Sequence, residues 1–151
     1  PQPRRGLAMH GAPALPDGFA RFPYVDPDAR PGGRITIGVQ GSYDGLNPFT
    51  VKGLTAAQGI AAFTIEPLMR RSLDEPFTLY PLIAESVEMP EDRSRITFRL
   101  DKRARFSDGE PVTASDIRFS FELLRNHGRP NYREYYGKVA SVEVLDPATI
   151  S

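Results

Sequence analysis

The chain of 151 residues contains no cysteine, no long apolar run and no run of like charges. The missing cysteines exclude disulfide bonds, thiolate catalysis and cysteine-ligated metal sites. A membrane-spanning helix needs about eighteen consecutive apolar residues, and the sequence has no such stretch. Acidic and basic residues number 19 each. This balance argues against a nucleic-acid-binding tail or a membrane-surface helix, because both require concentrated positive charge.

The sequence also offers no candidate catalytic or metal-binding group. His10 and His127 are the only histidines, and neither has carboxylates at a spacing typical of metal ligands. Ser107 precedes an aspartate but lacks the Gly-x-Ser-x-Gly pattern of a nucleophile elbow. The adjacent carboxylates at residues 74–75 point apart by default, and no Gly-x-Gly-x-x-Gly phosphate loop is present. We therefore expect no enzyme activity, no metal and no cofactor.

One passage combines a turn signature with a helix start. Asp108 can accept a hydrogen bond from the backbone two residues on, and Gly109 can adopt a positive φ because it has no Cβ. Thr113 stands where an N-cap is expected, and Asp116 can complete a capping box three residues later. The carboxylate also faces the positive end of the helix dipole. The pattern predicts a chain reversal followed by a helix from about Ala114.

The same helix has an apolar stripe and a stop signal. Residues at i, i+4 and i+7, together with two neighbours, predict its buried face: Ile117, Phe119, Phe121, Leu123 and Leu124. The residues expected in water are Arg118, Glu122 and Arg125. Gly128 and Pro130 predict the end of the helix.

Other elements follow from periodicity. Alternating apolar residues predict strands over residues 33–39, 85–89, 95–100 and 139–144. In the first of these, Ile35, Ile37 and Val39 are expected to face inward. Alanine-rich residues 55–65 predict a helix, because alanine has strong helix propensity and little bulk. A turn at residues 146–147 leads into a second strand that stops at residue 151, and a hairpin cut there predicts an N-terminal fragment of a longer protein.

Several short motifs occur in an order that is typical of one family. The longest is Phe-Ser-Asp-Gly-Glu-Pro-Val-Thr-Ala-Ser-Asp at residues 106–116. The others are Leu46-Asn47-Pro48, Glu66-Pro67-Leu68, Pro81-Leu82-Ile83-Ala84-Glu85-Ser86 and Phe98-Arg99-Leu100. From about Ala8 onward, the chain thereby resembles the family 5 extracellular solute-binding proteins, the oligopeptide and dipeptide receptors of ABC importers. Four further motifs resemble the YejA-like branch: Met9-His10-Gly11, residues 22–29, Asn47-Pro48-Phe49 and Asp74-Glu75-Pro76.

The resemblance implies an α/β fold of the periplasmic-binding-protein type (type II, peptide-binding cluster), present here in part. Residues 1–32 are then an extended, proline-rich N-terminal arm that lies on a surface, because proline lacks the backbone donor of regular structure. Residues 33–47 begin the first lobe and hold its first strand. Residues 48–151 form a small inserted α+β subdomain that is incomplete at its C-terminal end.

The resemblance also implies a function. The expected role is the periplasmic substrate-binding component of an ABC importer, a monomer that captures oligopeptides or peptide-like compounds between two lobes and delivers them to an inner-membrane permease. The start at residues 1–5 lacks the apolar region of a signal peptide, which indicates a mature or trimmed chain. Other interpretations remain open: a receptor for an opine-like conjugate, a nickel complex or haem, or a periplasmic chaperone for unfolded chains.

The expected ligand-binding residues are Lys52, Gly53 and Leu54, which follow the Leu-Asn-Pro motif by a few positions. In peptide-binding relatives this segment pairs with the ligand as an added strand, so the backbone makes the contacts. Gly53 suits that role because a residue without Cβ lets another backbone approach closely. An ordinary flexible glycine before a helix is an equally good interpretation. Lys52 stands where some relatives carry an acidic residue for the peptide amino terminus, so it favours a carboxylate or phosphate instead.

Overall fold

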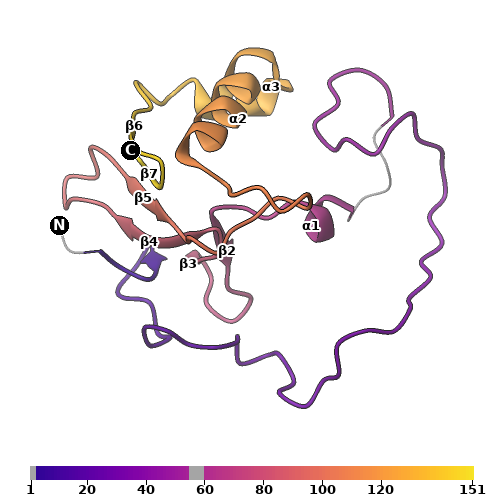
Figure 1. Ribbon diagram of the computed structural model, residues 1–151, viewed down its shortest axis with the longest axis horizontal. Coiled ribbons are helices and arrows are strands. Elements are labelled where there is room, and N and C mark those ends of the chain that lie inside the picture. Colours follow the sequence, from indigo (N-terminus) through magenta and orange to yellow (C-terminus); the bar gives the residue numbers. More distant parts are fainter. Residues whose placement is uncertain (1–2, 55–59) are drawn as a thin grey trace.

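The computed structural model describes residues 3–54 and 60–151, which form two small antiparallel sheets and a pair of packed helices (Figure 1). The first sheet has the order β1-β3-β2, with β1 at Leu7–Ala8, β3 at Thr78–Pro81 and β2 at Met69–Arg71. The second has the order β4-β5-β7-β6, with β4 at Ala84–Glu88, β5 at Thr97–Leu100, β7 at Thr149–Ile150 and β6 at Val144–Asp146. The helices are α1 at Ile60–Thr64, α2 at Ala114–His127 and α3 at Pro130–Tyr136.

The hairpin predicted near residues 85–100 is confirmed as β4 and β5, with Val87 opposite Phe98. Its turn is closed by the amide of Arg93, which donates to the carbonyl of Pro90 at 3.0 Å. Leu100 is buried and Arg99 is exposed, as the alternation predicts.

The C-terminal hairpin forms as β6 and β7, but the strand predicted over residues 139–144 begins only at Val144. The reason is local: the amide of Val139 still bonds the carbonyl of Tyr136 at 3.2 Å, so the chain is leaving α3 there. Glu143 and Ser151 exchange backbone hydrogen bonds of 2.8 and 2.9 Å beside the hairpin. Strand β7 thereby lies between β5 and β6.

The predicted capping box of α2 is confirmed. The amide of Thr113 donates to Asp116 Oδ2 at 2.8 Å, and the amide of Asp116 donates back to Thr113 Oγ1 at 3.4 Å. At the other end, Gly128 caps the helix: its amide donates a hydrogen bond of 2.9 Å to the carbonyl of Leu124. Pro130 does more than stop α2, because it opens α3, where a first-turn proline loses no helical hydrogen bond.

The core lies where α2 meets the second sheet. Leu100, Ala114 and Ile150 are buried together, and Ile117 packs against them. The prediction that Phe119 and Leu123 widen this buried face is wrong, since they are 66% and 47% exposed. At about 100° per residue, Phe119 and Leu123 lie about 160° and about 120° around the helix from Ile117, so they face away from the sheet.

The strand predicted over residues 33–39 does not form. Ile35, Ile37 and Val39 are 86%, 73% and 58% exposed, and the segment has no regular secondary structure. A strand is stable only when its backbone groups are paired, and among the described residues no strand lies beside this segment. The start of the helix predicted at residue 55 lies outside the described residues. The division into arm, first lobe and inserted subdomain stays a prediction.

The N-terminal arm contacts both sheets. Strand β1 pairs with β3, so the expectation that the arm has no regular structure is wrong at Leu7–Ala8, where no proline interrupts the backbone. Arg4 exchanges two backbone hydrogen bonds of 2.9 Å with Val87 of β4. The amide of Met9 donates at 3.1 Å to the carbonyl of Phe77, a residue held at a φ of 62°. Figure 1 shows the rest of the arm following an extended path past the sheets.

An acid and a buried tyrosine hold the next part of the arm. Glu75 Oε1 accepts from the amide of Ala14 at 2.9 Å, and the hydroxyl of Tyr80 accepts from the amide of Leu15 at 3.0 Å while donating to Glu75. Burial, and then the bond to Glu75, raise the pKa of Tyr80 above its usual 10.0. Phe19 packs edge-on against the Tyr80 ring at 5.0 Å. The Asp74-Glu75-Pro76 motif is therefore a docking point for the arm.

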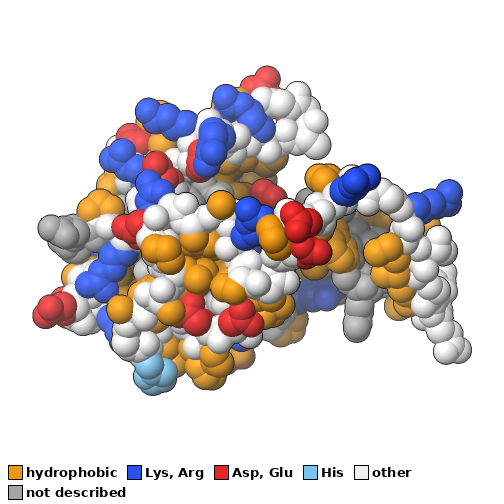
Figure 2. Space-filling model, turned by 90° about the horizontal axis from the view of Figure 1, so that it is seen from below, with side chains coloured by type: hydrophobic (Ala, Val, Ile, Leu, Met, Phe, Trp, Pro, Cys, Tyr) orange, Lys and Arg blue, Asp and Glu red, His pale blue; other side chains and the backbone are white. Residues whose placement is uncertain are grey.

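Charges of both signs are dispersed over the face shown in Figure 2, around a broad area of hydrophobic side chains. Within residues 3–54 and 60–151, no helix combines the length and apolarity needed to cross a membrane.

Replacing Gly109 with valine is expected to lower the free energy of unfolding by about 1–3 kcal/mol. Gly109 has a φ of +93° and open space around its Cβ position, so the cost is backbone strain and not a clash. Urea denaturation measures it. Gly38→Val is the matched control, because Gly38 is equally open and has no positive φ. An equal loss in both variants would show that the turn does not require Gly109.

Replacing Tyr80 with phenylalanine is expected to loosen the arm by about 1–2 kcal/mol, because the Leu15 amide and the Glu75 carboxylate lose a partner. Hydrogen exchange at the amides of Ala14 and Leu15 reports it, with Tyr24→Phe as control. Because the pKa of Tyr80 is higher in the folded protein than in the unfolded chain, its protonated hydroxyl contributes its full stability below the unfolded pKa of about 10. This stability is lost as the pH rises through the folded-state pKa. The wild-type arm should therefore loosen above about pH 10, whereas the protection factors of these two amides in Tyr80→Phe should stay constant across that pH range.

Candidate functional site

The segment that contains the predicted ligand-binding residues is a closed loop, residues 41–54. Asp44 joins its two ends: the Asp44 amide donates to the carbonyl of Leu54 at 2.8 Å, and the Leu54 amide donates to Asp44 Oδ2 at 2.7 Å. Both bonds lie in exposed surroundings, so each contributes about 1 kcal/mol at most. Together, these two hydrogen bonds fix the position at which residues 52–54 leave the loop.

The Leu46-Asn47-Pro48 motif forms a tight turn inside this loop. Asn47 Oδ1 accepts from the amide of Phe49 at 2.9 Å, which is an Asx-turn. The carbonyl of Asn47 accepts from the hydroxyl of Thr50 at 2.8 Å. Pro48 presets its own φ for this turn. The family motif is therefore a structural element that shapes the loop.

The loop is attached to the helical pair through two contacts. Arg129 Nε donates to the carbonyl of Thr50 at 2.7 Å, and the ring of Phe49 meets Tyr132 edge-on at 5.9 Å. Tyr132 lies beside Tyr136, with ring centroids 5.9 Å apart, and burial raises the pKa of Tyr136 above its usual value. The junction between α2 and α3 therefore positions the candidate loop.

The structure places the three predicted binding residues on the exposed rim of the loop. Gly53 has a φ of +90°, and a Cβ there would lie 2.7 Å from Asp44 Oδ2, so the glycine is required by the loop itself. Both backbone groups of Leu54 are already bonded to Asp44. Among the described residues, no hydrogen bond engages the backbone of Lys52 or Gly53. That a ligand pairs with these two residues as an added strand stays a prediction.

Sequence reasoning missed Asp44 and Arg129. An aspartate next to Gly45 in a glycine-rich loop is a turn signal, but its partner ten residues later is not encoded in that signal. Arg129 lies between Gly128 and Pro130, and these two neighbours predict only the end of a helix. Both residues act by positioning backbone, and periodicity does not reveal such contacts.

The residues considered for chemistry do not converge. Asp108 accepts from the amide of Glu110 at 3.0 Å, as the turn predicts, and Glu75 holds the arm. In the parts of the chain that the structure describes, no group of three histidine, aspartate or glutamate side chains is placed to hold a metal ion. The expectation of no enzyme activity stays a prediction.

The chain is similar to known proteins along most of its length. The family model for bacterial extracellular solute-binding proteins, family 5 Middle, matches residues 78–151. Over 148 residues, the chain is 49% identical to a protein of Agrobacterium fabrum strain C58 named peptidoglycan-binding protein YepA, covering 94% of this chain and 24% of that protein. Over 141 residues, it is 38% identical to the probable peptide-binding protein YejA of the same strain, covering 93% and 22%. The chain thus spans about a quarter of the length of the curated relatives it matches.

Solved structures also resemble parts of the chain. The binding protein AgaA in complex with agropinic acid, from A. tumefaciens R10, is 31% identical with a TM-score of 0.49, over 55% of this chain and 16% of that chain. Haemophilus influenzae OppA in complex with the peptide RPPGFSPFR is 28% identical with a TM-score of 0.43, over 60% and 21%.

Replacing Gly53 with alanine is expected to break the bonds between Asp44 and Leu54, since the new methyl group meets Asp44 Oδ2 and the backbone is strained. Hydrogen exchange at the Leu54 amide should accelerate about tenfold or more, the equivalent of about 1.4 kcal/mol. Gly45→Ala is the matched control in the same loop, because Gly45 has open space and no positive φ. Equal exchange in the two variants would contradict the role assigned to Gly53.

Proposed function

The chain belongs to the bacterial extracellular solute-binding proteins, family 5, in the YejA-like branch, and we propose that it acts in the substrate-binding component of an ABC importer for peptides. Its fold class is that of the periplasmic binding proteins of the peptide-binding cluster, of which the chain comprises a part. The protein captures its ligand in the periplasm and delivers it to an inner-membrane permease. It catalyses no reaction.

The observation that carries this proposal is the rim of the closed loop. Lys52 and Gly53 lie exposed on this rim and present backbone groups that no other described residue uses. A peptide that pairs with them as an added strand is held through its main chain, which every peptide shares. Lys52 adds a positive charge that suits a carboxylate of the ligand.

The ligand class we propose is peptides released from peptidoglycan. The name of the 49% identical relative, peptidoglycan-binding protein, supports this choice, and so does the name of the probable peptide-binding relative. Such peptides are rich in carboxylates, which matches a lysine where some members of the family carry an acidic residue. The second lobe of the receptor encloses the remainder of the ligand.

The full-length protein is expected to bind these peptides with micromolar or better affinity, whereas residues 1–151 alone bind them far more weakly. A single wall of a two-lobe site makes only a few backbone bonds of about 1 kcal/mol each, which do not offset the several kcal/mol lost on immobilising a peptide. Isothermal titration calorimetry compares the two proteins against enzymatically released peptidoglycan peptides. A pool of ordinary tri- to octapeptides serves as the control ligand.

Comparable affinity in the full-length protein and in residues 1–151 would show that the site lies within this chain and that the two-lobe interpretation is wrong. Equal binding of both peptide pools would keep the peptide receptor and refute the peptidoglycan preference. No binding of either pool by the full-length protein would refute the peptide receptor itself.

A further inference from the structure

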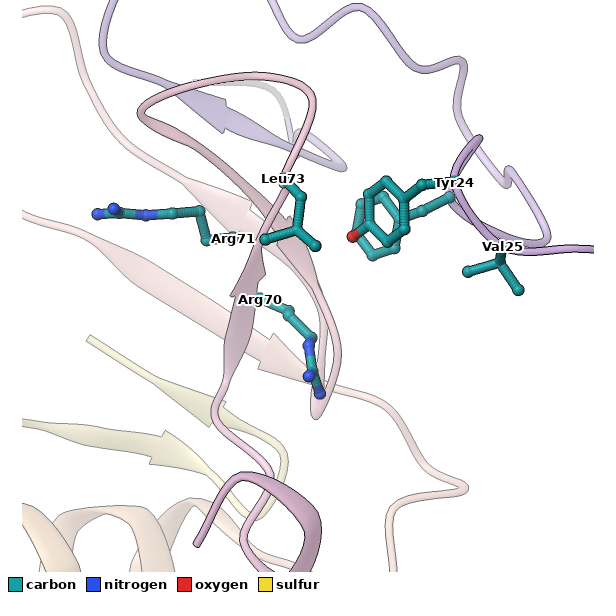
Figure 3. Close-up of a pocket in the computed structure, with 6 residues that line it drawn as sticks. Tyr24, Val25, Arg70, Arg71 and Leu73 are labelled. Atoms are coloured by element: carbon teal, nitrogen blue, oxygen red, sulfur yellow. The ribbon is translucent and has the colours of Figure 1, made fainter. Parts of the chain in front are cut away.

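A pocket outside the candidate loop lies between the N-terminal arm and the outer strand of the first sheet. Its volume is about 350 Å³, and it is lined by Phe22, Tyr24, Val25, Arg70, Arg71 and Leu73. Figure 3 shows Leu73 extending toward the ring of Tyr24 and Arg70 on the same side of the strand, with its guanidinium below that ring, whereas Arg71 extends to the opposite side. Pockets of this size are in the range that accommodates small ligands.

The sheet register explains why Arg70 faces the pocket. Arg70 of β2 is directly opposite Tyr80 of β3, and residues in such a pair share one face of the sheet. Tyr80 packs against Phe22 with ring centroids 5.7 Å apart, and Phe22 stacks on Tyr24 at 5.1 Å with an angle of 7° between the rings. The aromatic rings of the arm and the guanidinium of Arg70 therefore lie on the same side of the sheet.

Arg71 takes the other face, because successive residues of a strand alternate. Its guanidinium lies 6.0 Å from the ring centroid of Phe77. Within residues 3–54 and 60–151, no acidic side chain forms an ion pair with either arginine. No acidic side chain lines the pocket either. The pocket thus combines one uncompensated guanidinium with an exposed aromatic ring.

Arg70 and Tyr24 each favour a different chemical group in a ligand. The planar guanidinium of Arg70 binds a carboxylate through two parallel hydrogen bonds. The ring of Tyr24 provides a flat apolar surface for the C–H face of a ring, and its hydroxyl provides a polar edge. A ligand that satisfies both has a saturated ring with a carboxylate close to it.

We propose that this pocket is an accessory binding site for a sugar ring that bears a carboxylate, with the ring on Tyr24 and the carboxylate on Arg70. The choice of sugar rests on the proposed function: muramic acid is the carboxylate-bearing sugar of peptidoglycan. Its carboxylate is free where the amide link to the peptide has been hydrolysed. The class of reaction that supplies this ligand is therefore the same amide hydrolysis that releases peptides, and the pocket keeps the receptor where peptides are set free.

Saturation-transfer NMR on the full-length protein tests the proposal with two probes, N-acetylmuramic acid and N-acetylglucosamine. The second sugar lacks only the lactyl group that carries the carboxylate. We expect N-acetylmuramic acid to bind about tenfold more tightly, and we expect Arg70→Gln to abolish that difference. Arg70→Lys keeps the positive charge but loses the planar guanidinium that makes two parallel hydrogen bonds. It should therefore retain only part of the preference for N-acetylmuramic acid. Tyr24→Leu should weaken both sugars.

Arg95→Gln is the matched control, because Arg95 is an exposed arginine of the connection between β4 and β5 and lies outside the pocket. An equal affinity for the two sugars in the wild type would overturn the proposal, as would an unchanged preference in Arg70→Gln. If Arg70→Gln unfolds, the folded Arg70→Lys and Tyr24→Leu variants decide the same question.

Peptide binding is measured on the same variants, so that the two proposals fail separately. Arg70→Gln should bind released peptides within about twofold of the wild type, since the pocket shares no residue with the candidate loop. A wild type that binds no peptide but still prefers N-acetylmuramic acid would refute the proposed function and support the pocket. A wild type that binds peptide without any sugar preference would refute only the pocket.

Discussion

Both sheets depend on strands from distant parts of the chain, because the edge of a sheet leaves a row of backbone groups that must find partners. Strand β3 pairs on one side with its sequence neighbour β2 and on the other with β1 of the N-terminal arm. Strand β5 pairs with β4 through a short turn and with β7 near residue 151. The middle of the chain thus forms local hairpins, and its sheets are complete only when the distant strands dock.

The candidate loop depends on a sequence of such attachments. The Thr113–Asp116 capping box fixes where α2 begins, and the amide of Ala114 donates to the carbonyl of Pro147 at 2.9 Å, which ties that end to the β6–β7 turn. Helix α2 then places α3, whose N-cap residue, Arg129, holds the loop. The capping box and the loop are thus joined by a continuous series of contacts, each of modest energy.

What the sequence predicts well is what depends on near neighbours. The turn at Gly109, the capping box at Thr113 and the hairpin of β4 and β5 each involve residues a few positions apart, and all three are confirmed. The strand predicted over residues 33–39 does not form. Alternation indicates which face of a strand would be buried, but it does not identify the neighbouring strand that would pair with it.

Long-range contacts were outside the reach of such reasoning. The hydroxyl of Tyr80 meets the arm 65 residues earlier in the chain, and Arg129 reaches the loop 79 residues earlier. Neither residue carries a local pattern that names its partner. For the candidate site, the resemblance identified the segment and the glycine, whereas the closing role of Asp44 came only from the geometry.

In the two proposals, the candidate loop and the pocket that contains Tyr24 and Arg70 recognise ligands through different physical interactions. At the loop, backbone pairing is short-ranged and reads no side chain, and the bonds of Asp44 prepare the rim before the ligand arrives, which lowers the entropy lost on binding. At the pocket, an exposed guanidinium acts through charge, and such attraction is screened over about 8 Å at physiological salt. Raising the salt concentration is therefore expected to weaken binding at Arg70 and the charge attraction at Lys52, whereas the backbone pairing at Lys52 and Gly53 is little affected.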